Sequence, residues 1–243
     1  MVKLSINGRE FQAEPCDTVL AVARRAGIEI PTLCHLETVH DYGACRVCLV
    51  EVERRGRKRL VTACLYPVEE GLTVTTDSER VSKVRSTIIE LLLARTPESE
   101  EIIKVANRYG ITVSRFTDVD ENNNDKCILC GLCTRVCSEV VGVDAISLVN
   151  RGTRREVALP FYDDETECIA CGSCAYVCPT SAITLTDSSV ARTIIWPNSR
   201  AEFPMKECAG CGNHYAPVKQ LQYMADKAHL SVREFDYCPD CRH

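Results

Sequence analysis

The chain has 243 residues, of which 45% are hydrophobic and 26% charged, and its formal net charge is −5 at pH 7. Such values are typical of a globular protein of several modules, and the negative charge gives no reason to expect a nucleic-acid partner. The 17 cysteines are exceptional. Because their number is odd, most lie in C-x2-C units and no apolar leader precedes them, we expect metal ligation in a reducing cytoplasm rather than secreted disulfides. No apolar run approaches the length of a membrane span.

Residues 1–77 predict a small domain that begins with strands. Val2, Leu4 and Ile6 alternate up to an Asn7-Gly8 turn, which is the strongest short-range signal for a hairpin. A helix is expected over 18–26, and further strands over 47–53, 58–63 and 72–74. Hairpin, helix, cysteine-containing loop and further strands follow one another in the order of a β-grasp ferredoxin.

Four cysteines of this region have the spacing C-x10-C-x2-C-x15-C, namely Cys34, Cys45, Cys48 and Cys64. Together with the residues around them (30–34, 43–52 and 62–64), they resemble the N-terminal [2Fe–2S] domain of the large iron–sulfur subunit of respiratory complex I. The same domain occurs in cluster-bearing subunits of iron-only hydrogenases and of NAD-linked hydrogenases and formate dehydrogenases. The resemblance implies that the four cysteines hold a [2Fe–2S] cluster. His35 is then expected to be a loop residue, and Cys16 receives no role.

Two helices are predicted in residues 78–118. Over 78–95 the apolar residues recur at a spacing near 3.6, and a second helix over about 98–109 has acidic residues in its first turn. In complex I and many of the related hydrogenases, a cubane held by one histidine and three cysteines follows such a helix. Neither residue type occurs between Cys64 and Cys127. We therefore predict a helical connector that lacks this cluster.

Residues 119–186 contain two cysteine runs, 127–137 and 168–178, each with the spacing C-x2-C-x2-C-x3-C. This spacing resembles that of bacterial ferredoxins with two [4Fe–4S] clusters, in which the fourth cysteine of each run ligates the other cluster. The resemblance implies a crossed assignment. One cluster takes Cys127, Cys130, Cys133 and Cys178. The other takes Cys168, Cys171, Cys174 and Cys137.

Residues 187–243 are interpreted as a linker followed by a small metal module. The linker is the stretch 186–204, which we expect to lie over a surface of the protein. The cysteines of the module form two C-x2-C units, Cys208 with Cys211 and Cys238 with Cys241, around a helix expected over 216–229. Paired units of this kind are typical of a closed structural zinc site. The same four thiolates could hold a third [4Fe–4S] cluster, although we favour zinc. His214 is available as a substitute ligand but is not needed.

The predicted fold class is α+β: a β-grasp [2Fe–2S] domain, a bacterial-type two-[4Fe–4S] domain and a C-terminal four-cysteine module. These clusters pass single electrons, and the absence of a G-x-G-x-x-G fingerprint predicts that this chain holds neither flavin nor NAD. The resemblance implies a non-catalytic electron-transfer subunit of an NAD(P)-linked hydrogenase or formate dehydrogenase, electron-bifurcating or not. Its partners would be a flavoprotein that oxidises NAD(P)H, the flavoprotein's small [2Fe–2S] companion, and a catalytic subunit or a ferredoxin. The alternative is a freestanding polyferredoxin that shuttles electrons between enzymes.

Overall fold

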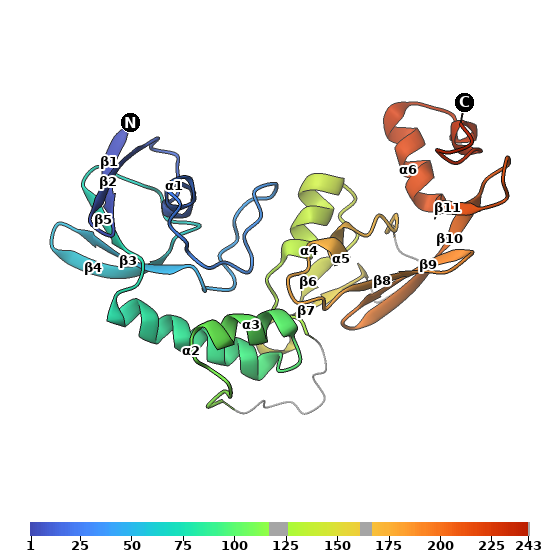
Figure 1. Ribbon diagram of the computed structural model, residues 1–243. Helices are drawn as coiled ribbons and strands as arrows, with labels where there is room; N and C mark the ends of the chain where they lie inside the picture. Colours follow the sequence, from blue (N-terminus) through green and yellow to red (C-terminus); the bar gives the residue numbers. More distant parts are fainter. Residues whose placement is uncertain (117–125, 161–166, 243) are drawn as a thin grey trace. The chain divides into compact units, whose positions relative to one another are not determined.

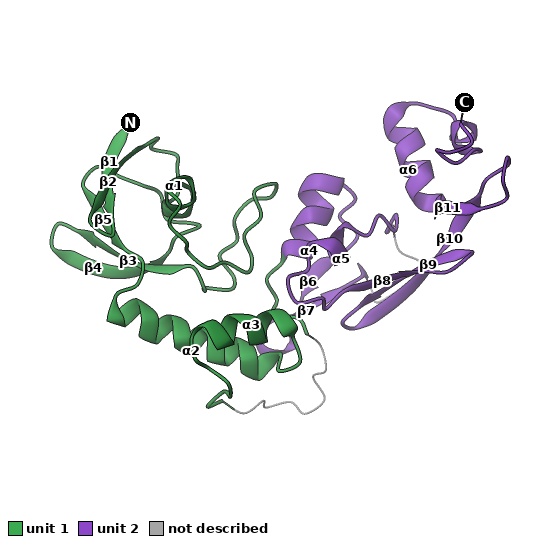
Figure 2. Cartoon of the chain, in the orientation of Figure 1, with its two compact units in different colours: residues 1–131 green, residues 132–243 purple. Residues whose placement is uncertain are grey.

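The computed structural model describes residues 1–116, 126–160 and 167–242, and these form two compact units, Met1–Gly131 and Leu132–His243 (Figures 1 and 2). Both units contain helices and strands, which confirms the α+β class. The predicted boundary between residues 118 and 119 lies outside the described residues. Within the described part of the chain, no helix combines the length and the apolar character needed to cross a membrane.

The first unit begins with a five-stranded sheet in the order β2-β1-β5-β3-β4, in which β1 and β5 are parallel and the other pairs antiparallel. The predicted hairpin is confirmed, with Asn7 and Gly8 at φ 51° and 77°, as a two-residue turn requires. The Asn7 side chain also accepts a hydrogen bond from the backbone N–H of Thr76 (2.9 Å). The elements are β1 (Val2–Ile6), β2 (Arg9–Ala13), α1 (Val19–Arg25), β3 (Leu49–Arg54), β4 (Arg57–Thr62) and β5 (Leu72–Thr75).

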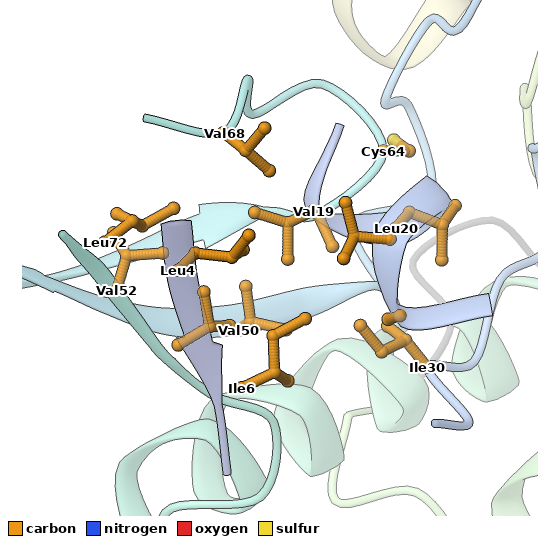
Figure 3. Packing of buried hydrophobic residues seen from close by; sticks show 14 of the residues in the cluster. Leu4, Ile6, Val19, Leu20, Ile30, Val50, Val52, Cys64, Val68 and Leu72 are labelled. Atoms are coloured by element: carbon orange, nitrogen blue, oxygen red, sulfur yellow. The ribbon is translucent and has the colours of Figure 1, made fainter. Parts of the chain in front are cut away.

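The core of this domain lies between the sheet and α1 (Figure 3). Ile6, Leu20 and Val50 are completely buried, and burying a side chain of this kind stabilises the fold by about 1.5–3 kcal/mol. Thr18 caps α1 by accepting a hydrogen bond from the backbone of Ala21. Cys48 and Cys64 belong to the same buried cluster. The packed core therefore continues into the cysteine-containing loop.

Two further helices of the first unit occur where they were predicted, α2 (Glu79–Arg95) and α3 (Glu100–Arg108). Ser78 caps α2 through a hydrogen bond from the backbone of Val81. One stripe of α2 is buried, and its members stand four residues apart: Val81, Arg85, Ile89 and Leu93. This spacing places them on one face of the helix. Arg85 therefore lies on the buried face, where the other members are apolar.

The second unit combines short helices with a two-stranded ladder, β6-β7, and a four-stranded antiparallel sheet in the order β11-β10-β9-β8. A π-helical segment, Val136–Val141, follows α4 directly and carries Cys137. The other elements are α4 (Leu132–Arg135), β6 (Ser147–Val149), β7 (Glu156–Ala158), α5 (Ser173–Tyr176), β8 (Thr184–Asp187), β9 (Ala191–Trp196), β10 (Ser199–Glu207), β11 (His214–Pro217) and α6 (Val218–Ala228).

The interpretation of residues 186–204 as a linker is wrong, because most of this segment forms β9 and the greater part of β10. Ala201, Phe203 and Met205 alternate with exposed residues along β10 and are buried, which is the period of a half-buried strand. Pro204 is tolerated because it pairs with Ala191 at the end of the β9–β10 ladder. The sheet runs from β8 into the tail, so a boundary between residues 186 and 187 would cut through β8.

Candidate metal centres

The four cysteines predicted to hold the [2Fe–2S] cluster are all buried, each with at most 4% of its surface exposed. The sulfur atoms of Cys48 and Cys64 are 3.5 Å apart, and the backbone N–H of Cys45 donates a hydrogen bond to the sulfur of Cys34 (3.5 Å). Around a tetrahedral metal with a metal–sulfur bond of about 2.3 Å, two thiolates stand about 3.8 Å apart. The Cys48–Cys64 spacing therefore suits two ligands of a single metal ion.

Hydrogen bonding between these thiols shifts their pKa values in opposite directions. The hydrogen bond with Cys64 lowers the pKa of Cys48 to about 7 and raises the pKa of Cys64. The hydrogen bond with Cys34, followed by burial, raises the pKa of Cys45. A buried thiolate needs a compensating cation, and metal binding displaces the protons that remain. His35 contacts Asp41 instead, with Nδ1 2.6 Å from the carboxylate oxygen.

Arg85 of α2 fastens the loop that carries Cys45 and Cys48. Its guanidinium, in a residue only 5% exposed, donates to the carbonyl of Val47 (3.1 Å) and to that of Thr76 (3.0 Å). It also donates to the carbonyl of Leu49. At the C-terminal end of α2, Arg95 donates to the carbonyl of Cys127 (2.8 Å). One helix thus holds parts of two predicted ligand loops within the first unit.

We predict that Arg85→Lys lowers the free energy of unfolding by about 2–3 kcal/mol, because an ammonium lacks the planar fork needed to reach these separate carbonyls. Denaturant unfolding of the cluster-loaded protein measures the loss. Arg80→Lys, on an exposed part of the same helix, is the matched control and should change stability by less than about 0.5 kcal/mol. Equal stability of the two variants would contradict the role of Arg85.

One pocket of the second unit is lined by cysteines from both runs. Cys168, Cys171 and Cys174 come from the second run, and Cys137 is the last cysteine of the first. Most of the remaining wall is apolar and includes Ile146, Ile194 and Trp196. Backbone N–H groups donate to two of the sulfurs, from Ala145 to Cys137 (3.3 Å) and from Ala170 to Cys168 (3.4 Å). Four thiols in a mostly apolar wall are the donor set that an iron–sulfur cluster requires.

Burial raises the pKa of Cys168 to about 11 and that of Cys174 to about 12. Both thiols are therefore neutral at pH 7, and a bound iron would have to displace their protons. The loop between Cys168 and Cys171 is held from the sheet, because Arg192 of β9 donates to the carbonyl of Ala170 (2.9 Å). Arg192 is itself held by two hydrogen bonds to Asp187, of 2.7 and 2.8 Å.

Gly172 lies in the wall of this pocket at φ +78°, and a Cβ built there would lie 2.6 Å from Leu185 Cδ1. We predict that Gly172→Ala lowers the free energy of unfolding by about 2 kcal/mol, since it adds a close contact to left-handed backbone strain. Gly152 has a similar φ of +58° and open space around it. Gly152→Ala therefore measures the backbone strain alone, about 1 kcal/mol. Thermal unfolding compares the two variants, and equal losses would refute the contact with Leu185.

The cysteines predicted to hold the first cubane are divided between the units. Cys127 and Cys130 are buried in the first unit, and the backbone N–H of Leu129 donates to the sulfur of Cys127 (3.4 Å). In the second unit Cys133 is buried and Cys178 half-buried, and the N–H of Ala182 donates to the sulfur of Cys178 (3.2 Å). Their assignment to one cluster stays a prediction.

The tail brings Cys208, Cys211, Cys238 and Cys241 together, with all four sulfur atoms within 4.8 Å of one another. The Cys211 and Cys238 sulfurs are 3.9 Å apart, close to the spacing of about 3.8 Å around a single zinc ion. Thiolates of a cubane bind four different irons and stand further apart. Backbone N–H groups, first that of Cys238, lower the pKa of Cys208 to about 6. His214, in β11, is not a member of this group.

Three residues of these sites, Arg85, Arg192 and Trp196, received no role from the sequence alone. Arg85 could have been noticed, because it interrupts the apolar stripe of α2. Trp196 falls in the supposed linker, and nothing in the local sequence relates it to cysteines more than twenty positions earlier. Its place in the pocket depends on β9 pairing with β8.

Residues 1–79 match the family of 2Fe–2S iron–sulfur cluster binding domains, and residues 126–182 and 167–213 match the 4Fe–4S dicluster domain. The chain is 35% identical over 204 residues to the alpha chain of the NADPH-Fe(3+) oxidoreductase of Geobacter sulfurreducens. It is 34% identical over 206 residues to one chain of the NADH-quinone oxidoreductase of Rhizobium meliloti. It is 35% identical over 211 residues to the HndD chain of the NADP-reducing hydrogenase of Solidesulfovibrio fructosivorans.

Each alignment covers 75% of this chain but only 24%, 24% and 36% of the three relatives, so the chain spans about a quarter to a third of their length. Among solved structures, the fold resembles a chain in the crystal structure of an NAD+-reducing [NiFe]-hydrogenase in the H2-reduced state. The TM-score is 0.58 and the identity 24%, over 95% of this chain and 99% of that one. The chain is therefore an iron–sulfur protein with a 2Fe–2S domain and a 4Fe–4S dicluster domain, related to subunits of NAD(P)-linked oxidoreductases and hydrogenases.

Proposed function

We propose that the chain is an electron-transfer subunit that carries electrons between an NAD(P)H-oxidising flavoprotein and a catalytic hydrogenase or formate dehydrogenase subunit, or a ferredoxin. The observation that carries this proposal is the pocket in which Cys137 joins Cys168, Cys171 and Cys174. It matches the crossed ligation of a two-cluster ferredoxin. A buried four-cysteine set precedes it in the same chain, so several one-electron centres follow one another.

We assign the ligands accordingly. Cys34, Cys45, Cys48 and Cys64 hold the [2Fe–2S] cluster. Cys127, Cys130, Cys133 and Cys178 hold the first [4Fe–4S] cluster, and Cys168, Cys171, Cys174 and Cys137 hold the second. When bound, the clusters supply one-electron chemistry. The protein holds them in buried loops and directs backbone N–H groups at their thiolates, and both factors contribute to the reduction potentials.

For the tail we propose a structural zinc ion held by Cys208, Cys211, Cys238 and Cys241. The short distances between the sulfur atoms support a single ion over a cubane. The closed set of four thiolates leaves no open coordination position for a substrate. The zinc therefore ties the chain after α6 to the end of β10 and takes no part in electron transfer.

The partners are proposed from the relatives, whose names describe subunits of NADPH- and NADP-linked enzymes. In the proposed complex, a flavoprotein and its small [2Fe–2S] companion deliver electrons from NAD(P)H, and a separate subunit performs the terminal reaction. We place this complex in the cytoplasm, where reduced thiols persist.

The test is purification of the tagged chain from its native host, followed by identification of co-purifying subunits. We expect a stable complex that contains a flavoprotein, and NAD(P)H should then reduce the [2Fe–2S] and [4Fe–4S] centres, as monitored by EPR. A monodisperse monomer without a flavoprotein, whose clusters accept electrons from several enzymes, would replace this proposal with a freestanding polyferredoxin.

A further inference from the structure

Trp196, the last residue of β9, forms part of the wall of the four-cysteine pocket in the second unit. Its side chain is among the largest that are fully buried, with 1% of the residue exposed. The indole Nε1 is buried and has no hydrogen-bond partner among the described residues. A buried donor without an acceptor costs about 1–3 kcal/mol, and native proteins retain few of them. No protein atom among the described residues accepts a hydrogen bond from this donor, and a group bound in the pocket would supply the missing acceptor.

The composition of the pocket limits what that partner can be. Its wall consists of the four cysteines, Ser173 and apolar residues. Burial raises the pKa of Cys174, and the indole N–H opposes that rise as a donor near the sulfur. The geometry nevertheless falls short of a hydrogen bond to Cys174. The indole N–H therefore lies beside sulfur, in a pocket whose proposed occupant brings further sulfur acceptors.

The position of the indole is set by regular structure. Trp196 pairs with Ser199 across the tight β9–β10 turn, and β9 also pairs with β8. Ile194, which points to the same side of β9 two residues earlier, is completely buried in the same pocket. A donor held by a paired strand keeps its orientation whether the cluster is oxidised or reduced.

We propose that the Trp196 indole N–H donates a hydrogen bond to a sulfur atom of the cluster held by Cys137, Cys168, Cys171 and Cys174, and thereby raises its reduction potential. The acceptor is a bridging sulfide of that cluster. Reduction by one electron increases the negative charge on the sulfurs, so the hydrogen bond stabilises the reduced form more than the oxidised form. The inference rests on the proposed function, because it requires the cubane to be bound.

The same bond would distinguish the two cubanes. Trp196 is the only tryptophan in the chain, so the first cubane cannot receive an equivalent hydrogen bond. Because only the second cubane accepts this hydrogen bond, the bond raises the reduction potential of the second cubane relative to that of the first. Trp196 thus favours electron transfer from the first cubane to the second within the ferredoxin domain.

The first experiment is an EPR-monitored redox titration of the cluster-loaded protein and of Trp196→Phe, which removes the N–H but retains an aromatic ring. We expect the reduction equilibrium of one cubane to shift about tenfold toward the oxidised form, which equals about 59 mV for a one-electron couple. The other two centres should be unchanged. Ile195→Val, at an exposed position of the same strand outside the pocket, is the matched control and should leave all three potentials unchanged.

The second experiment needs no substitution. Protein labelled with indole-15N tryptophan carries a single labelled indole, and pulsed EPR of the reduced protein should reveal a 15N hyperfine coupling on one cubane signal. Cubane signals without this coupling, together with equal potentials for Trp196→Phe and Ile195→Val, would overturn the inference and leave the proposed function standing. Absence of any [4Fe–4S] signal from iron-reconstituted protein would overturn both.

Discussion

Cys137→Ala is expected to remove the cubane of the second cysteine run, although Cys137 belongs to the first. The reason is that Cys137 lies in the π-helical segment that borders the pocket of Cys168, Cys171 and Cys174. Iron analysis should fall from about ten to about six atoms per chain, and one of the two [4Fe–4S] signals should disappear. Cys16→Ala, at an exposed cysteine outside all the sets, should retain the full iron content.

Double variants separate crossed from uncrossed ligation. If Cys137 and Cys174 bind the same cubane, the variant Cys137→Ala/Cys174→Ala loses no more iron than either single variant and keeps about six atoms. Cys133→Ala/Cys137→Ala removes a ligand from each cubane and should keep only about two atoms, those of the [2Fe–2S] centre. The opposite order of these two iron contents would show that each run holds its own cluster.

Cys238→Ala is expected to unfold the tail while leaving the clusters intact. Cys238 is buried, its backbone N–H donates to the sulfur of Cys208 at 3.2 Å, and its own sulfur lies 3.9 Å from that of Cys211. Structural zinc contributes on the order of 10 kcal/mol of binding free energy, which acts as folding free energy. We expect the zinc content to fall from about one atom per chain to nearly none, and limited proteolysis to cleave after β10.

The metal content of the unsubstituted protein decides between the two options for the tail. With zinc, iron analysis gives about ten atoms per chain, and Cys238→Ala leaves that number unchanged. With a third cubane, the protein holds about fourteen irons and the variant about ten. Cys16→Ala serves again as the control, since it should alter neither the zinc nor the iron content.

The cysteine sets could be predicted from the sequence because most of their members lie in short runs with a characteristic spacing. The runs 127–137 and 168–178 and the two C-x2-C units of the tail are readable as ligand sets without coordinates. The hairpin at Asn7-Gly8 and the helix α2 could also be predicted, since turn chemistry and helical period are local properties of the sequence. Family matches to residues 1–79 and 126–213 agree with this interpretation.

The sequence by itself therefore determined that the chain carries 2Fe–2S and 4Fe–4S domains, and it predicted which cysteines act together. Only the tertiary structure showed that the supposed linker is a pair of strands, that Arg85 holds the loop around Val47, and that Trp196 borders the pocket of Cys168 and Cys174. The physical reason is separation along the chain. Arg85 and Val47 are 38 positions apart, and a hydrogen bond or a pocket wall of that kind exists only after the strands and helices between have packed.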